Sequence, residues 1–294
     1  MRRRVLFPAD RGLQLRMVVA AVVTPLGVLA SVVAVVALLP LKVALGVGFA
    51  AVLGTGVAVA ERKRNDASQL LEPGAAPELH AIVERLAVAA DLPKPEIALD
   101  REAQPNSWII DLPGRPPRLH VTTGLLELLD ARELEAVVAH ELSHVAHRDA
   151  TVMSVVGMPG AVLRAGGAHS FGAWFLMFGQ VVAAGIGHVA GLGTNALSRY
   201  RELAADAGAV ALTGRPSALA SALMKVSGRL GRLPADDLRV AAGRNAFHLL
   251  PVGERDRAGL ARLLDTHPSL ERRLAAIERH ERRLQAARIA GPAD

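Results

Sequence analysis

The hydrophobic pattern of the chain begins with two long apolar runs. Residues 17–39 contain no charged side chain, and a short break at Pro40 and Lys42 separates them from a second run, residues 43–60. A helix needs about 20 residues to cross the hydrocarbon core of a bilayer, whereas a signal peptide has a shorter apolar core followed by polar sequence. The two runs therefore predict a helical hairpin in the membrane.

Basic residues flank both outer ends of the predicted hairpin. Arginines recur within residues 2–16, and the segment Glu61-Arg62-Lys63-Arg64 follows the second run. Positive charge is retained on the cytoplasmic side of membrane helices. We therefore expect a multi-pass protein of the cell membrane, with both ends of the hairpin and the domain that follows it in the cytoplasm.

Apolar character returns in the second half of the chain. Residues 152–163 form a short run broken by glycine and proline, and residues 171–193 form a run long enough to span a bilayer. A pair of spans returns the chain to the cytoplasm, whereas a single span does not. This parity favours two further membrane segments, which makes about four transmembrane helices in all.

The remaining sequence has the pattern of a globular domain. Helical spacing over residues 77–90 ends at two prolines, and Asp130 with Glu133 predicts the capped start of a helix over residues 131–147. We also expect strands at 96–99, 107–112 and 118–122, and amphipathic helices at 218–230 and 268–287. The fold class is therefore mainly α, with a small β-sheet beside the 131–147 helix.

Composition narrows the classes of function. The net charge is +6, but only 3% of the residues are aromatic, and the interleaving of basic and aromatic residues that single-strand binders use is missing. We expect a lipid bilayer and no nucleic acid among the partners. The absence of cysteine excludes disulfides, thiolate zinc ligands and cysteine nucleophiles.

The segment His140-Glu141-Leu142-Ser143-His144 lies within the predicted 131–147 helix. Residues four apart share one face of a helix, so both imidazoles can reach one metal ion. Glu141 lies beside them, where it can hold a bound water. The segment therefore predicts a zinc site of the hydrolytic kind, which needs three protein ligands and an open position.

The third ligand can come from two kinds of source. Metzincins place a glycine three residues after the second histidine and a histidine three further on, but this chain has His147 and Ala150 there. The alternative is an acidic residue on a second helix, and Glu202 and Asp206 share a helix face. One of these can bind zinc while the other orients a liganding histidine.

These segments together resemble the HtpX-like family of membrane zinc metallopeptidases, which are related to the CAAX prenyl proteases. The matching pieces are residues 124–129, 133–144 and 147–149, then Ser198-Arg199, Glu202, Ala205-Asp206, His267-Pro268 and Arg273. The resemblance implies an α+β catalytic domain of the zincin (gluzincin) type. It further implies one Zn²⁺ per chain, held by His140, His144 and Glu202.

The same resemblance implies further roles and four segments. Glu141 would be the general base, and Asp206 would orient a ligand. Candidates to contact substrate or an oxyanion are Asn106, Tyr200, His267 and Arg273. The segments are a hairpin at 1–64, a first catalytic part at 65–150, two membrane segments at 151–194, and a second catalytic part at 195–294.

One stretch departs from the pattern of the family. The family usually presents an Asn-Ala-Phe-Ala-type stretch as the sheet edge that pairs with substrate, where this chain has Asn106-Ser107-Trp108-Ile109. Addition of substrate as an extra strand is still expected there. Trp108 is expected to be a core or membrane-interface anchor, with contact to substrate as the alternative.

The resemblance implies an endopeptidase that acts on protein or peptide substrates, in quality control of misfolded membrane proteins at the cytoplasmic face. A prenyl-protein processing protease is the second enzyme hypothesis, although such proteases have more membrane segments than this hydropathy supports. A catalytically silent membrane scaffold is the third. Retention of Glu141 argues against it, because a structural site needs no base beside an open position.

Overall fold

The computed structural model of the protein describes most of the chain, in two compact units. The described residues are 11–38, 40–66, 69–111, 115–147, 162–163, 177–230, 249 and 265–290. We call the described residues within Gln69–Ala150 and Ser198–Asp294 the globular unit, and those within Arg11–Ser68 and Thr151–Leu197 the apolar unit.

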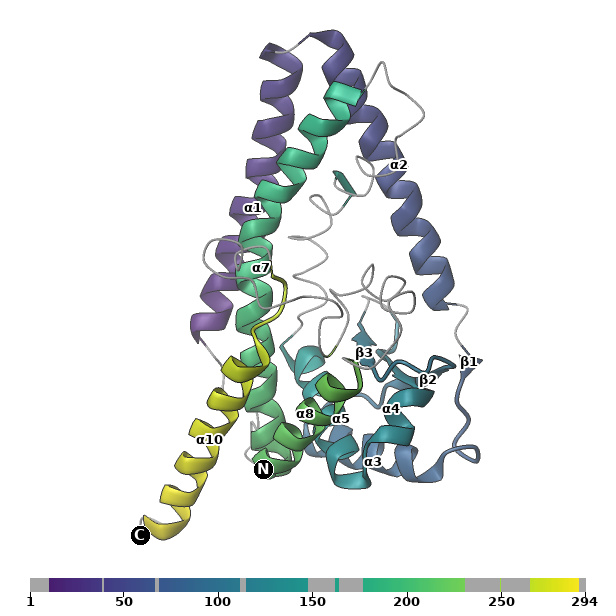
Figure 1. The fold of residues 1–294 in the computed structure, drawn as a ribbon, viewed down its shortest axis with the longest axis vertical. Helices are drawn as coiled ribbons and strands as arrows, with labels where there is room; N and C mark the ends of the chain where they lie inside the picture. The colour runs from purple at the N-terminus through teal and green to yellow at the C-terminus, as the bar shows by residue number, and fades with distance from the viewer. Residues whose placement is uncertain are drawn as a thin grey trace. The chain divides into compact units, whose positions relative to one another are not determined.

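The apolar unit contains helices α1 (Arg11–Leu38) and α2 (Leu41–Asp66) and the first part of α7 (Met177–Thr213) (Figure 1). Within the described part of the chain, these three helices are long and apolar enough to cross a membrane. The two helices predicted at residues 17–60 are therefore confirmed. The predicted run at 152–163 lies almost wholly outside the described residues, and so do residues 171–176 of the next one.

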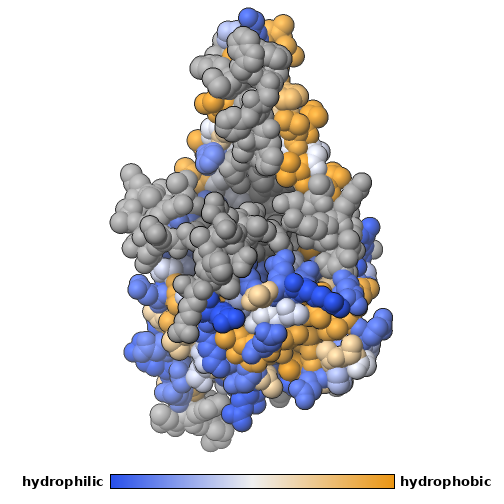
Figure 2. Space-filling view, turned by 45° about the vertical axis from the view of Figure 1, so that its right-hand side comes forward, coloured by the Kyte–Doolittle hydropathy of each residue, from blue (hydrophilic) through white to orange (hydrophobic). Residues whose placement is uncertain are grey.

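Large hydrophobic side chains are exposed along α1. Leu15, Val19, Val22 and Leu26 are each more than half exposed. Figure 2 shows mainly hydrophobic residues on the apolar helices, whereas the globular unit shows many hydrophilic residues around a hydrophobic patch. Lipid tails are as apolar as these side chains, so a helix that faces lipid gains nothing by hiding them. The exposure agrees with helices that span a bilayer.

Small residues allow close backbone contacts inside the apolar unit. A Cβ atom on Gly179 of α7 would lie 2.7 Å from the Cα of Gly46, and one on Gly54 would lie 1.9 Å from the carbonyl oxygen of Val162. Ala50, between the two α2 glycines, is fully buried. Small residues at four-residue spacing permit such approaches between membrane helices. One face of α2 is therefore a packing surface.

Helix α7 continues through Asn195, where the apolar pattern of the sequence ends. Its charged residues Arg199, Arg201, Glu202 and Asp206 all follow Leu197, the last residue of the apolar unit. Charged side chains are costly at the centre of a bilayer. The membrane-crossing part of α7 is therefore its first part, and the remainder belongs to the globular unit.

The globular unit contains a mixed four-stranded sheet in the order β1-β2-β4-β3. The strands are β1 (Gln69–Leu70), β2 (Glu96–Asp100), β3 (Ser107–Ile110) and β4 (Arg118–Thr122). The three predicted strands are confirmed, with β3 antiparallel and β2 parallel to β4. Strand β1 was not predicted, because two residues are too few to show an alternating pattern. Among the described residues, β3 lies at one edge of the sheet.

Helices cover the sheet and enclose one core. They are α3 (Pro77–Ala89), α4 (Thr123–Leu128), α5 (Ala131–Ala146), α8 (Pro216–Leu230) and α10 (Leu270–Ala290). The core joins Ile97 and Leu119 of the sheet, Val137 of α5 and Leu223 of α8. Helix α5 thus packs against both α8 and the edge strand β3. This packing brings the segment with His140 and His144 next to the start of β3.

Candidate metal centre

Helix α5 is anchored at its first turn. The Asp130 side chain accepts hydrogen bonds from the backbone N–H groups of Arg132 and Glu133, and Glu133 accepts one from the N–H of Asp130. The predicted capping box is therefore present. Glu133 also accepts hydrogen bonds from Ser221 and Lys225 of α8, both at 2.7 Å. These contacts tie the first turn of α5 to α8 and so restrain the helix that bears both histidines.

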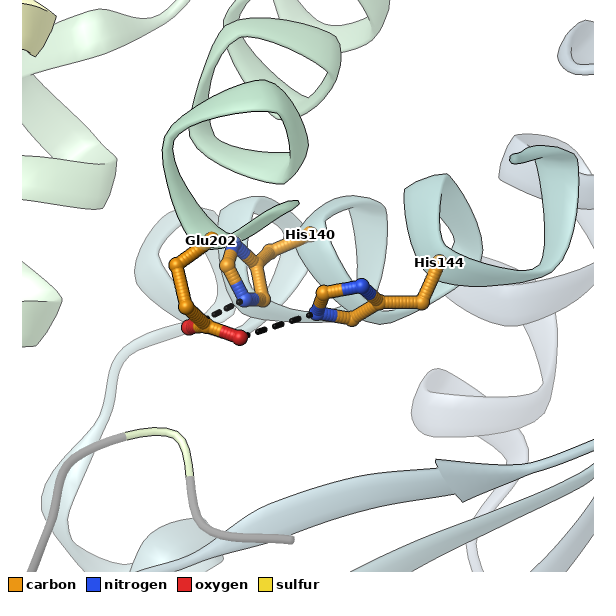
Figure 3. Close-up of side chains that lie close together, drawn as sticks. All are labelled: His140, His144 and Glu202. Atoms are coloured by element: carbon orange, nitrogen blue, oxygen red, sulfur yellow. Dashed lines mark ion pairs between the residues drawn. The ribbon is translucent and has the colours of Figure 1, made fainter. Parts of the chain in front are cut away.

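His140 and His144 on α5 converge with Glu202 on α7 (Figure 3). One ligand atom from each residue lies within 4.8 Å of the other two. His140 Nε2 is 3.7 Å from Glu202 Oε2, and His144 Nε2 is 3.6 Å from Glu202 Oε1. Of the described residues, only these three form a group of His, Asp or Glu side chains whose ligand atoms lie close enough together to hold one metal ion.

The spacing of these atoms fits zinc. Tetrahedral zinc with bonds of 2.0–2.1 Å to nitrogen and oxygen separates its ligand atoms by about 3.4 Å. The two nitrogen–oxygen separations, 3.7 Å from His140 and 3.6 Å from His144 to Glu202, are only a few tenths of an ångström longer. Within the described structure, Glu202 Oε2 is also buried without a hydrogen-bond partner, because its neighbours lie at 3.5–3.7 Å. A cation bound between the three side chains would satisfy this oxygen.

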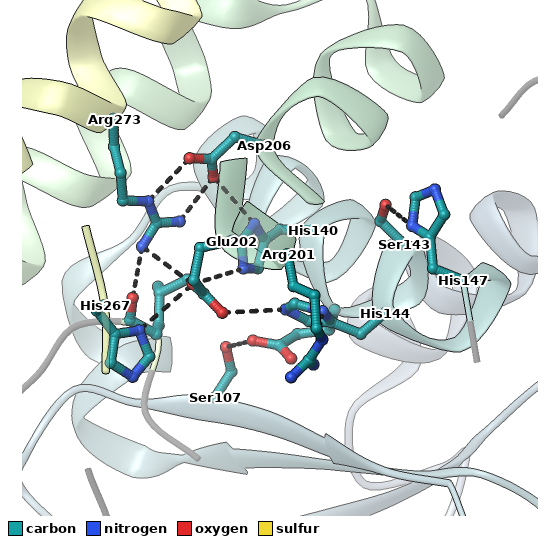
Figure 4. A network of polar contacts seen from close by, with 12 residues as sticks. Ser107, His140, Ser143, His144, His147, Arg201, Glu202, Asp206, His267 and Arg273 are labelled. Carbon is teal, nitrogen blue, oxygen red and sulfur yellow. Dashed lines mark hydrogen bonds and ion pairs between the residues drawn. The ribbon is translucent and has the colours of Figure 1, made fainter. Parts of the chain in front are cut away.

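Asp206 lies behind the cluster, on the same face of α7 as Glu202. Its Oδ1 is 3.0 Å from His140 Nδ1 (Figure 4). A proton on Nδ1 that is donated to Asp206 leaves the lone pair of Nε2 for a metal, which is the usual arrangement around liganding histidines. Asp206 itself accepts two hydrogen bonds from Arg273 of α10.

The carboxylates around His140 favour a positive charge on its ring. Burial is the largest influence and by itself lowers the pKa of the ring, but hydrogen bonds to Asp206 and Glu202 together outweigh it and raise the pKa of His140 to about 9. Burial likewise lowers the pKa of Arg273, and the Asp206 carboxylate more than reverses that effect. The two carboxylates therefore stabilise a positive charge at this site.

Glu141 lies next to the cluster and is almost fully buried. Its Oε1 accepts a hydrogen bond of 2.8 Å from the hydroxyl of Ser107, the first residue of β3. Ser107 was not among the predicted site residues. The sequence signal for it was the departure of Asn106-Ser107 from the Asn-Ala pattern.

Residues 73–281 match the sequence profile of peptidase family M48. The chain belongs to this family. M48 peptidases in general depend on zinc, and this chain has helices able to cross a membrane, so it is a membrane zinc metallopeptidase. The resemblance of its motifs to HtpX-like metallopeptidases is thereby confirmed.

Several relatives of this M48 peptidase are named as HtpX homologues. "Protease HtpX homolog 1" of Streptomyces coelicolor is 41% identical over 98% of this chain and 99% of its own length. "Protease HtpX homolog" of Moorella thermoacetica is 42% identical over 74% of this chain and 77% of its own length. The crystal structure of S. mikatae Ste24p has a similar fold, with a TM-score of 0.50 and 19% identity over 72% of this chain. This chain spans 52% of the Ste24p chain.

Four residues of this M48 peptidase were predicted to contact substrate or an oxyanion. Two of them, His267 and Arg273, lie next to Glu202. His267 Nδ1 is 3.5 Å from Glu202 Oε2. Arg273 is fully buried, and besides Asp206 it binds the carbonyl oxygen of Leu249 at 2.6 Å. Its guanidinium is therefore held in place by partners within the protein.

The other two residues predicted to contact substrate or an oxyanion in this M48 peptidase are Asn106 and Tyr200. Asn106 is buried, and its Oδ1 accepts a hydrogen bond from the backbone N–H of Leu249 at 3.1 Å. Tyr200 precedes Glu202 by two residues, which puts it about 200° away around the axis of α7. Arg201, which was not predicted, has Nη2 3.5 Å from Nδ1 of His144.

Proposed function

We propose that the protein is a zinc endopeptidase in which His140, His144 and Glu202 hold one Zn²⁺ and Glu141 is the general base. The observation that supports this most strongly is the convergence of Nε2 of two histidines on the two oxygens of one buried carboxylate. Three ligands from the protein leave a fourth tetrahedral position open, as hydrolytic zinc sites require.

The chemistry follows from the side chains around the cluster. Zinc, when bound, lowers the pKa of a water toward about 7 and polarises the scissile carbonyl. The Glu141 carboxylate accepts the proton of the attacking water and then donates it to the leaving amine. Asp206 holds His140 in the tautomer that exposes Nε2, and Arg273 holds Asp206. We assign Arg273 a positioning role, because its guanidinium is occupied by Asp206 and Leu249.

The edge strand β3 is the proposed docking site for substrate. A peptide that pairs with an edge strand gains backbone hydrogen bonds without a sequence requirement. Strand β3 begins at Ser107, whose hydroxyl already contacts the proposed base. A peptide along β3 would therefore run close to Glu141 and the proposed zinc ligands.

The cellular role is also part of the proposal. We propose that residues 65–150 and 195–294 form a catalytic domain on the cytoplasmic side. Residues 1–64 and 151–194 would contain the membrane segments. Basic residues at both ends of the hairpin support this orientation. Cleavage that depends on backbone pairing suits the removal of misfolded membrane proteins, because such substrates share exposed backbone rather than a sequence. We expect no nucleic-acid partner.

The test is metal content together with proteolysis of an unfolded protein, in detergent, for the native chain and Glu141→Gln. Both proteins are expected to bind about one zinc, since the substitution leaves every proposed ligand in place. Cleavage is expected only for the native chain, because removal of a general base costs about 10²–10⁴-fold in rate. A matched control is Glu127→Gln, an exposed acidic residue of α4 that is expected to leave both quantities unchanged.

The outcomes separate the hypotheses. Zinc in both proteins without cleavage of the unfolded protein or of a prenylated peptide would favour the scaffold. Cleavage of the prenylated peptide alone would favour the processing protease. Absence of bound zinc in the native chain would contradict the central assignment.

A further inference from the structure

The carboxylate of Glu141 has a specific partner that its proposed role leaves unexplained. The Ser107 hydroxyl donates to Glu141 Oε1 at 2.8 Å, and the two side chains are only 2% and 4% exposed. Hydrogen bonds to an ionised group are stronger than neutral ones, and screening by water is weak in a buried site. The contact is therefore strong enough to determine which way the carboxylate points.

Ser107 is itself held by a rigid frame. Its backbone is paired with Val121 in the antiparallel β3–β4 ladder. The preceding residue, Asn106, exchanges hydrogen bonds with Thr122 at both its N–H and its carbonyl oxygen, and its side chain binds Leu249. A serine has a single side-chain torsion that places its hydroxyl, so little freedom remains in the donor. Glutamate has three torsions, so an unrestrained carboxylate would lose more conformational entropy on reaching the reactive position.

We propose that Ser107 is a positioning residue for the general base, and this inference rests on the proposed function. By donating to Oε1, Ser107 leaves Oε2 as the oxygen that faces the attacking water. The water proton passes to Oε2 and is later delivered from Oε2 to the leaving amine, while Oε1 keeps the hydrogen bond from Ser107 throughout. Because Ser107 begins the strand at which substrate is proposed to dock, one residue connects the docking edge with the base.

The experiment measures kcat and KM for a fluorogenic peptide, with the zinc-loaded full chain in detergent. Ser107→Ala removes the donor and only one heavy atom. Loss of a hydrogen bond to a charged group is expected to lower kcat by about ten- to a hundredfold, with KM and zinc content unchanged. Ser107→Thr retains the hydroxyl and suits a strand, so most of kcat is expected to return.

Thr123→Ala is the matched control. It removes a partly buried hydroxyl of the same unit, whose hydrogen bond goes to the carbonyl oxygen of Glu102, and it is expected to leave kcat unchanged. Melting temperatures show whether each variant is folded. The inference is overturned if Ser107→Ala retains native kcat, if Ser107→Thr is as slow as Ser107→Ala, or if Thr123→Ala lowers kcat as much as Ser107→Ala for the same loss of melting temperature.

Glu141→Gln distinguishes a failure of the inference about Ser107 from a failure of the proposed function. If Glu141→Gln is inactive while Ser107→Ala is fully active, the inference about Ser107 fails and the proposed function stands. If Glu141→Gln is itself as active as the native chain, the proposed function fails, and the role of Ser107 fails with it.

Discussion

Arg273 and Asp206, 67 residues apart in the sequence, form a buried bidentate ion pair behind the metal centre. Arg273 Nε and Nη2 donate to the two carboxylate oxygens of Asp206 at 2.8 and 2.6 Å. Both side chains are at most 1% exposed. Since Asp206 also binds His140, this pair connects α10 to a proposed zinc ligand.

Arg273→Ala is expected to destabilise the protein strongly. The substitution leaves the buried Asp206 carboxylate without its cation, which costs about 3–5 kcal/mol. Loss of the support behind His140 should also weaken zinc binding by about ten- to a hundredfold. Thermal unfolding and zinc titration measure the two effects. Arg272→Ala, an exposed neighbour on α10, is expected to change neither, and native zinc affinity in Arg273→Ala would contradict the proposed support.

Removal of the metal is expected to lower the melting temperature. Zinc that binds the folded chain alone stabilises it by about 2.7 kcal/mol when free zinc exceeds its Kd 100-fold. A chelator should therefore shift thermal unfolding to lower temperature, and added zinc should restore it. His144→Ala removes one proposed ligand and is expected to unfold at the same temperature with or without zinc. A full zinc-dependent shift in that variant would place the metal elsewhere.

Acid is expected to weaken the attachment of α5 to α8. Burial by itself raises the pKa of Glu133, but hydrogen bonds from Lys225, Ser221 and the Asp130 backbone outweigh it and lower that pKa below the ordinary 4.5. A lowered carboxyl pKa contributes stability that is present above about pH 4.5 and is lost as the pH falls through the folded-state value. The free energy of unfolding should therefore fall on acidification below pH 4.5.

Glu133→Gln tests this assignment. The variant should lose about 1–3 kcal/mol at neutral pH, because Lys225 loses its charged partner, and should show a shallower decline in acid. Urea unfolding across pH 3–7 measures both quantities. The exposed Glu127→Gln is the matched control, expected to follow the native curve. A native acid response in Glu133→Gln would assign the pH dependence to other carboxylates.

Gly54→Ala is expected to disturb the apolar unit. The added Cβ would lie 1.9 Å from the carbonyl oxygen of Val162, so the backbones must separate. Such overpacking costs about 1–3 kcal/mol. Gly56→Ala on the same helix is the control, because its Cβ would meet no atom from elsewhere in the described part of the chain within 4 Å. Thermal unfolding in detergent compares the two, and equal stability would show that the close contact contributes nothing.

Much of this protein could be predicted from local patterns. The spacing of His140 and His144 puts both on one helix face, and the same rule pairs Glu202 with Asp206. The capping box at Asp130 marked the start of α5, and alternation marked three strands. Each of these features depends on residues close together in the sequence. Strand β1 was missed because two residues contain too little of such a pattern.

The contacts that join distant segments could not be predicted in this way. Ser107 and Glu141 are 34 residues apart, and Leu249 and Asn106 are 143 apart. The first pair exists only because α5 packs against β3, and the second joins two segments that meet only in the folded chain. Apart from its departure from the Asn-Ala pattern of the family, nothing in the local sequence distinguishes Ser107 from any other polar residue at a strand end.

The sequence by itself therefore determined which reactive side chains are available, namely two histidines and a base on one helix and an acidic pair on another. It also determined the apolar runs that are long enough to span a bilayer. The tertiary structure decided how these groups are used. It placed Glu202 against both histidines, Asp206 behind His140 and the Ser107 hydroxyl on Glu141. The physical reason is that helix and strand periodicities are local properties of the chain, whereas the meeting of two elements depends on the packing of the whole core.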